Sequence, residues 1–385
     1  MMIRNALIHD AIHPEAYLGD IAITAGKISA IAAAGTLTPA HGEEVLDATG
    51  LEAYPGFVDA HSHLGLDDYG GPTGGTYDYN EMNDICSPHL RGMDSYYPQD
   101  AAIPMALAGG VTTVAAGPGS ANVLGGTFLA AKTYGKTLDE AMIAPAIAMK
   151  CAFGENPKRC YKDKTDSTRM TTAAKLREAL FNAKDYMLRK EAAQGDITKT
   201  PKYDMKAEAL IPVLKGEMPL KAHAHRSDDI LTALRIAKEF GVKITLEHCT
   251  EGHLIVEALK EANVPVAVGP TLTNASKLEL INKSWETPAA LSEAGLSVSI
   301  ITDAPVIPQQ YLPLCAGMAV KAGMDPFKAL QAITINPAKH IGLADRIGSL
   351  EVGKDADIVL TDGDPMVSAT TIKTVVLDGV VRVQG

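Results

Sequence analysis

The middle of the chain alternates apolar runs with stretches of helical periodicity, and this alternation restricts the possible folds more than any other feature. Continuous apolar runs are typical of strands buried on both faces, and helices between such strands predict a parallel sheet. In 385 residues the number of runs fits a (β/α)₈ barrel. After a first strand that ends at His61, strands are expected at 110–115, 126–131, 145–151, 219–225, 243–248, 265–269 and 296–303, and helices at 171–190, 228–239, 251–261 and 326–334.

The two ends of the chain have a different pattern, with short alternating strands separated by turn residues. Neither end has enough strands to form a stable sheet alone, so we expect the two ends to meet in one small β domain. The expected division is therefore 1–54 with 346–385 for this domain and 55–345 for the barrel. The terminal strands are expected at 3–8, 20–25, 27–32, 44–47, 356–360 and 372–381.

Composition argues against several classes of partner. The net charge is −11 and no cluster of Lys and Arg is present, which argues against nucleic acid. The 5 cysteines are scattered and form no C-x-x-C pair, as in the reduced thiols of an intracellular protein. No signal-peptide core and no uninterrupted apolar segment of about 18 residues is found, so we expect a soluble, cytoplasmic protein with no membrane partner.

Several of the expected barrel strands end in side chains that bind metals. His61 and His63 are two residues apart and therefore point to the same side of a strand, as two ligands of one divalent metal would. Since barrel enzymes assemble their active sites at the carboxyl ends of the strands, we expect these side chains to share one site. The other strand ends carry Lys150, His223 with His225, His248 and Asp303.

A set of motifs runs from the first barrel strand to the C-terminus: PGFVDAHSHLG, GGVTT, KAHAHRSDD, EHCTEGH, ITDAP, NPAKHIGL and GSLEVGKDADIVL. With these motifs the chain resembles the amidohydrolase superfamily over nearly its whole length. It is most similar to imidazolonepropionase-related enzymes, with dipeptidase and prolidase-like relatives, and IAMKCAFGENPKR resembles the segment around the carboxylated lysine of isoaspartyl dipeptidases. The resemblance implies a metal-dependent hydrolase of C–N bonds, built as a distorted (β/α)₈ TIM barrel with a small β-sandwich domain.

The resemblance also implies a set of metal ligands. Lys150 would be carboxylated on its amine, so that the carbamate bridges two metals. His225 faces the same way as His223, so either could be the ligand from the fifth strand; PLKAH favours His223 and leaves His225 as a supporting residue or a substrate contact. Zinc is the expected metal, although iron, manganese and cobalt accept the same ligand types. The implied ligands are His61, His63 and Asp303 for the more buried metal, and His223 and His248 for the more open one.

Hydrolysis of an amide is the expected reaction. A hydroxide held between the two metals would attack the carbonyl of a cyclic amide or of a peptide-like or N-acyl amino acid substrate, with Asp303 as proton shuttle. The alternative is an uncarboxylated Lys150, which favours a deaminase or an imidazolonepropionase-type ring hydrolase. In that alternative a single metal is held by His61, His63, His223 and Asp303.

Substrate contacts are expected in the segment after Lys150. The sequence GENPKRCYKDKTDSTRM brings Arg159, Tyr161 and Arg169 near the expected barrel mouth. An arginine fork binds carboxylates well, which favours a small-molecule substrate with a free carboxylate. A solvated basic loop is the alternative interpretation of the same residues.

Other residues near the mouth are less specific. His253 follows His248 closely and is a further possible substrate contact, and the Gly- and Asp-rich segment 66–98 is expected to lie over the mouth. The resemblance also implies a homo-oligomer. The remaining histidines, expected at the surface or in packing, are His9, His13, His41, His89 and His340.

Overall fold

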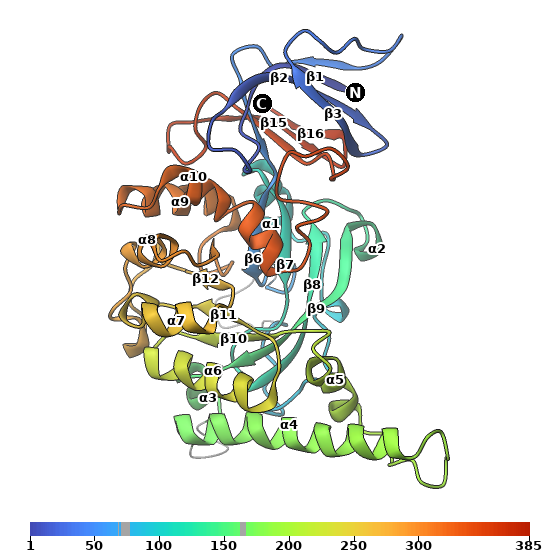
Figure 1. Ribbon diagram of the computed structural model, residues 1–385, viewed down its shortest axis with the longest axis vertical. Coiled ribbons are helices and arrows are strands. Elements are labelled where there is room, and N and C mark those ends of the chain that lie inside the picture. Colours follow the sequence, from blue (N-terminus) through green and yellow to red (C-terminus); the bar gives the residue numbers. More distant parts are fainter. Residues whose placement is uncertain (68, 71–77, 162–166) are drawn as a thin grey trace.

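The computed structural model describes residues 1–67, 69–70, 78–161 and 167–385, and its central feature is an eight-stranded sheet curled into a nearly closed barrel (Figure 1). The strands follow one another around the barrel in chain order. The prediction of an α/β chain with an eight-stranded barrel is confirmed. These strands are β6 (Phe57–Ser62), β7 (Val111–Ala116), β8 (Leu124–Lys132), β9 (Met142–Ala152), β10 (Leu220–Ala224), β11 (Ile244–His248), β12 (Val266–Val268) and β13 (Val298–Ile300).

One strand of the barrel differs from the prediction. β8 pairs antiparallel with both β7 and β9, whereas the other neighbouring pairs are parallel. A parallel crossover requires a dozen or more residues, usually with a helix, but only 117–123 connect β7 to β8. The short connection therefore reverses the chain direction, and the barrel departs from strict β/α alternation at this point.

The barrel closes between its first and last strands through side-chain and loop contacts. The carboxylate of Asp59 in β6 accepts hydrogen bonds from the backbone N–H (3.0 Å) and the hydroxyl (2.6 Å) of Thr302, just past β13. The backbone N–H of His63 donates to the carbonyl of Ala304 at 2.8 Å. These bonds hold the end of β6 beside the end of β13, and so bring His61 and His63 close to Asp303.

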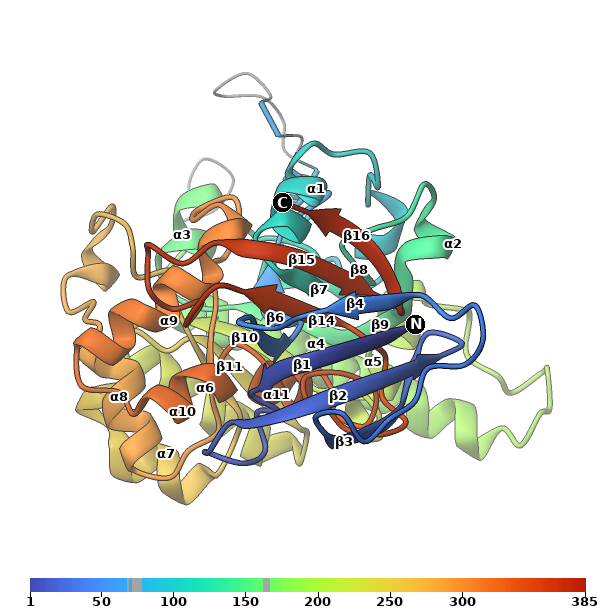
Figure 2. The ribbon, with the colours of Figure 1, turned by 90° about the horizontal axis from the view of Figure 1, so that it is seen from above.

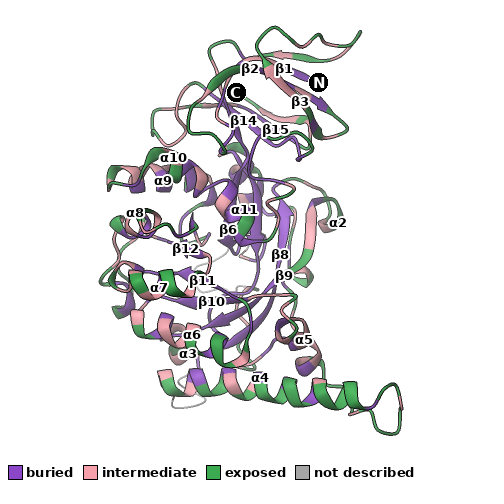
Figure 3. Ribbon diagram, in the orientation of Figure 1, coloured by how far each residue is buried: buried purple, intermediate pink, exposed green. Residues whose placement is uncertain are grey.

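Helices cover the outer face of the barrel, with buried sides toward the strands and exposed sides toward solvent (Figure 3). The expected helix at 251–261 begins only at Val256: the N–H of Glu251 donates to the carbonyl of His225, just past β10, and residues 252–254 form a separate 3₁₀ turn. No helix in the described ranges is long and apolar enough to cross a membrane. The helices are α1 (Ala102–Ala108), α2 (Leu138–Ala141), α3 (Glu155–Cys160), α4 (Arg169–Ala192), α5 (Met205–Leu214), α6 (Ser227–Phe240), α7 (Val256–Ala262), α8 (Glu286–Glu293), α9 (Leu312–Lys321), α10 (Pro326–Gln331) and α11 (Ile335–His340), with 3₁₀ turns η1 (Gly92–Asp94), η2 (Gly252–Leu254), η3 (Leu278–Leu280) and η4 (Gln309–Tyr311).

A second sheet combines strands from both ends of the chain (Figure 2). Its order is β16-β15-β14-β5-β1-β2-β3, with β4 paired to β1, so the two ends join where β14 pairs antiparallel with β5. The sheet has its own apolar core, which includes Ile3, Ile21 and Ile358. The exact domain boundaries stay a prediction. The strands are β1 (Met2–Ile8), β2 (Tyr17–Thr24), β3 (Lys27–Ala33), β4 (Val45–Asp47), β5 (Glu52–Pro55), β14 (Ile358–Thr361), β15 (Ile372–Leu377) and β16 (Val380–Gln384).

Candidate metal centre

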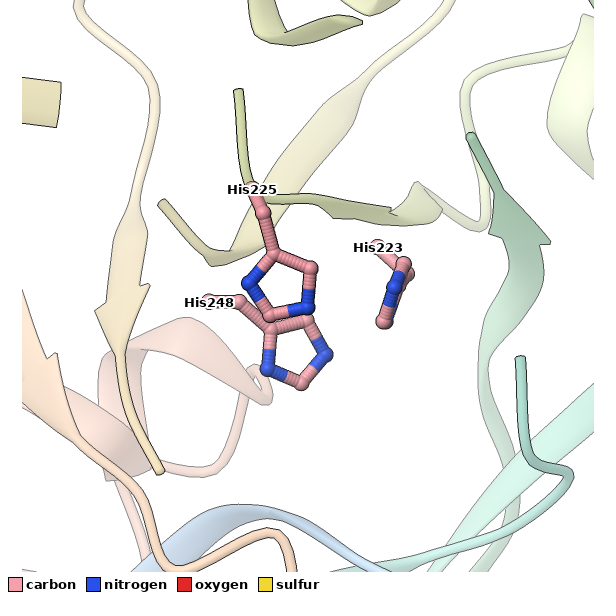
Figure 4. Close-up of side chains that lie close together, drawn as sticks. All are labelled: His223, His225 and His248. Carbon is pink, nitrogen blue, oxygen red and sulfur yellow. The ribbon is translucent and has the colours of Figure 1, made fainter. Parts of the chain in front are cut away.

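Two groups of side chains with metal-binding atoms lie at the carboxyl ends of the barrel strands. Within each group the atoms that could bind a metal are all within 4.8 Å of one another. In the second group the three imidazole rings converge from the ends of β10 and β11 (Figure 4), with ring centroids 4.2–4.7 Å apart. The first group is His61, His63 and Asp303, and the second is His223, His225 and His248.

The five histidines of the two groups are oriented in the same way, with Nδ1 within hydrogen-bond distance of another protein atom. Where the partner is a carbonyl, which can only accept, Nδ1 must carry the proton, and Nε2 then has a free lone pair. Metal-binding histidines show this arrangement, because the second hydrogen bond fixes the ring and its tautomer. The partners are Glu247 Oε2 for His61 (3.2 Å), the Gly117 carbonyl for His63 (2.7 Å), Ser120 Oγ for His223 (2.8 Å), Thr250 Oγ1 for His225 (2.7 Å) and the Gly269 carbonyl for His248 (2.7 Å).

The Nε2 atoms on the opposite side of these rings fit the requirements of a divalent cation. Among the residues that the structure describes, Nε2 of His223 and of His248 has no hydrogen-bond partner although it is buried, a costly condition that a metal ion would relieve. Burial lowers the pKa of His223 far below its usual value, so the ring is neutral and its lone pair is available. In the first group, Asp303 Oδ1 lies 3.3 Å from Nε2 of His63 and 3.5 Å from Nε2 of His61.

Lys150 joins the first group from the end of β9. Its Nζ lies 3.1 Å from Nε2 of His61, and the residue is completely buried. Burial lowers the pKa of this amine to about 8, so a substantial neutral fraction exists near physiological pH. A neutral amine is the form that reacts with carbon dioxide.

Asp303 is ionised despite its surroundings. Burial opposes its charge, but the imidazoles of His248, His63 and His61 outweigh this effect and hold the pKa of the carboxyl well below its usual range. Asp303 also has a φ of 54°, in the left-handed region that non-glycine residues seldom adopt. Backbone strain of this kind concentrates at functional sites, and here it accompanies the turn that carries the carboxylate.

Comparison with known proteins agrees with this geometry. The sequence profile of the Amidohydrolase family matches residues 53–382. The chain belongs to the amidohydrolase family. A crystal structure of an amidohydrolase from Thermotoga maritima MSB8 is 40% identical, covers 100% of both chains and superimposes with a TM-score of 0.95.

Curated relatives of this amidohydrolase-family chain are more distant. Amidohydrolase tasK of Hapsidospora irregularis is 29% identical over 94% of the chain, which spans only 40% of the length of tasK. A dihydroorotase of Elusimicrobium minutum is 24% identical over 94% of the chain and 88% of its own length. The resemblance stated from the motifs is therefore confirmed.

Beneath the first group lies a buried charged network that sequence analysis missed. The Glu247 carboxylate receives hydrogen bonds from Nζ of Lys221 (2.8 Å), Nε2 of His340 (2.7 Å) and Oγ1 of Thr245 (2.7 Å), in addition to its contact with His61. His340, expected at the surface or in packing, is buried, and its hydrogen bond to Glu247 makes it part of this network. Burial opposes the charge of Glu247, but His340 and Lys221 outweigh it and hold its pKa well below the usual value.

Arg169, one of the residues expected to bind a substrate carboxylate, is already engaged in ion pairs in the structure. Arg169 Nε lies 3.0 Å from Asp229 Oδ2, and its Nη2 lies 3.1 Å from Glu155 Oε1 and 3.7 Å from Glu279 Oε2. The guanidinium of Arg169 is thus committed to three carboxylates, which hold α3, α4 and α6 together with η3. Its expected role as an open fork is not what the geometry favours.

Of the other predicted contacts, only His225 belongs to one of the two groups. The Tyr161 hydroxyl is buried, accepts from the Asn122 amide (2.9 Å) and donates to the Glu81 carbonyl (2.9 Å). Arg159 is exposed on α3, and Nδ1 of His253 lies 2.8 Å from Oγ1 of Thr287. Of the segment 66–98, residues 68 and 71–77 lie outside the described residues.

The connection at 117–123 positions ligands of both groups, since the Gly117 carbonyl holds His63 and Ser120 holds His223. We expect Ser120→Ala to weaken divalent-metal binding to the second group by about 10- to 100-fold, because the imidazole of His223 loses the bond that fixes its ring. Competition with a chromophoric chelator measures this change. Ser95→Ala, at an exposed position, is the matched control, and equal affinity of both variants would contradict the assigned role.

Proposed function

We propose that this protein is a metal-dependent hydrolase of C–N bonds that acts on a cyclic amide or on a peptide-like or N-acyl amino acid substrate. The observation that carries the proposal is the common orientation of the five imidazoles, each with Nδ1 held by the protein and Nε2 turned inward. Family membership and the dihydroorotase relative support a reaction at an amide.

The chain offers ligands for two divalent cations, with zinc as the expected metal. Lys150 would lie between the two metals as a carbamate, formed when the neutral amine bonds to carbon dioxide and releases a proton. His225 would contact the substrate or support the second metal. We assign His61, His63 and Asp303 to the first cation, and His223 and His248 to the second.

Divalent cations at this position supply Lewis-acid polarisation of a carbonyl and lower the pKa of water. Asp303, ionised and close to the imidazoles of the first group, would accept a proton from the attacking water and return it to the leaving nitrogen. His223 and His225 are buried, and burial lowers the pKa of each far below its usual value, so the neutral imidazoles add no charge of their own.

A substrate with a free carboxylate is also part of the proposal. Homo-oligomerisation and a cytoplasmic location stay predictions from the sequence.

An activity screen of the zinc-loaded protein tests this function. Dipeptides, N-acyl amino acids and small cyclic amides are incubated with the protein, with and without a chelator, and amine or acid release is measured. We expect chelator-sensitive hydrolysis in at least one of these classes. Ammonia release from amino-substituted heterocycles with no amide hydrolysis would contradict the proposal and favour the one-metal deaminase.

A further inference from the structure

The loop after β12 brings a lysine to the second histidine group. Lys277, directly before η3, has a side chain that is only 16% exposed. Its ammonium donates to Oδ1 of Asn156 at 2.8 Å and lies 2.6 Å from Oε1 of Glu279. The same Glu279 oxygen lies 3.9 Å from Nε2 of His225, so Lys277 and His225 both lie close to one carboxylate oxygen.

The electrostatics of the second group agree with this placement. After burial, the ammonium of Lys277 is the strongest influence that lowers the pKa of His225, and it also acts on His223 and His248. Arg169 differs, because its guanidinium contacts three carboxylates.

An ion pair with Glu279 alone does not account for the position of the Lys277 ammonium. Oε2 of Glu279 already accepts the backbone N–H of Glu155 at 2.8 Å and lies 3.7 Å from Arg169, so the carboxylate has another donor and another positive partner. An ammonium has three donors; among the described residues, one of them bonds to Asn156, and Glu279 lies beside the ammonium as an ion-pair partner. Within the described ranges, this leaves the ammonium with donor capacity for a ligand.

His225 supplies a second donor beside it. The Nδ1 partner of His225 is the hydroxyl of Thr250, which can donate as well as accept. Nε2 of His225 can therefore carry the proton and donate to an anion, whereas the carbonyl partners of His63 and His248 fix the opposite tautomer. The two donors together suit a carboxylate.

We propose that Lys277, with His225, forms the subsite that binds the carboxylate of the substrate, in place of the arginines that follow Lys150. This assignment rests on the proposed function, since it names the group that recognises the acid part of the amide substrate. Such a subsite beside the metal groups would hold an N-acyl amino acid or a dipeptide by its carboxylate, with the amide toward Asp303.

Calorimetric binding of a matched pair of probes tests the subsite without turnover. N-acetyl-L-alanine and its uncharged amide, N-acetyl-L-alaninamide, are titrated into zinc-loaded wild type, Lys277→Gln, Lys277→Arg and Arg159→Gln. We expect wild type to prefer the acid, and Lys277→Gln to raise the Kd of the acid about tenfold or more while changing that of the amide by less than about twofold. Lys277→Arg, which keeps the charge, should retain the preference for the acid.

Three results would overturn the assignment. Wild type could bind acid and amide equally; Arg159→Gln could abolish the preference while Lys277→Gln keeps it; or Lys277→Gln could weaken both probes equally and lower the Tm, as a support for Glu279 would. Failure of the proposed function gives a different result. The binding experiment would still show a preference for the acid that depends on Lys277, but the activity screen would find no amide hydrolysis.

Discussion

Asp303→Asn is expected to lower kcat on the order of 100- to 10,000-fold, the range that a positioned proton-transfer group contributes. Asparagine has nearly the same shape but cannot accept the proton of the attacking water at neutral pH. The carboxylate lies 3.3 Å from Nε2 of His63 and 3.5 Å from Nε2 of His61, and these imidazoles keep it ionised. The measurement is kcat of the zinc-loaded variant on the substrate found in the activity screen.

Two controls distinguish the loss of proton transfer by Asp303 from the loss of bound metal. Asp345→Asn changes an exposed carboxylate away from the site and should leave kcat unchanged. Metal content and Tm are measured on both variants, because Asp303 is also an assigned ligand. A kcat within about twofold of wild type at full metal loading would rule out a proton-transfer role for Asp303.

The second large effect is on stability. We expect Glu247→Gln to lower the free energy of unfolding by about 3–5 kcal/mol, because it leaves the ammonium of Lys221 buried without its counter-charge. Lys221 is 1% exposed and Glu247 is 0% exposed, so water cannot compensate for the lost charge. Urea unfolding of the metal-free protein measures the change without a contribution from metal binding.

A double variant tests the cause. Glu247→Gln with Lys221→Met removes both charges, so it should cost less stability than Glu247→Gln alone. Glu257→Gln, at a residue whose side chain is 87% exposed, is the matched control and should change stability by less than about 0.5 kcal/mol. If Glu247→Gln were as stable as this control, the negative charge of Glu247 would not contribute to stability through its ion pair with Lys221.

The alternation of apolar runs with helices was enough to predict the barrel, because both periodicities are local properties of the sequence. The direction of β8 was not predicted, since an apolar run is the same in a parallel and an antiparallel strand. The sequence signal for the antiparallel direction was the length of the connection 117–123, which is too short for a parallel crossover.

For the candidate site, sequence analysis found the side chains at the strand ends but not their supporting contacts. His61 and His63 could be paired from their spacing alone. Glu247 and His340 are far apart in the chain, and only the fold brings them to 2.7 Å. Arg169 was interpreted by its local basic neighbours, although its carboxylate partners Asp229 and Glu279 come from distant segments.

Metal content per chain, compared between wild type and Lys150→Ala by elemental analysis, tests the central claim most directly. Lys150 Nζ lies 3.1 Å from Nε2 of His61, where a carbamate would reach the first cation. We expect about two metals per chain in wild type, falling to one or none in the variant. About one metal in wild type, unchanged in Lys150→Ala, would contradict the two-metal account.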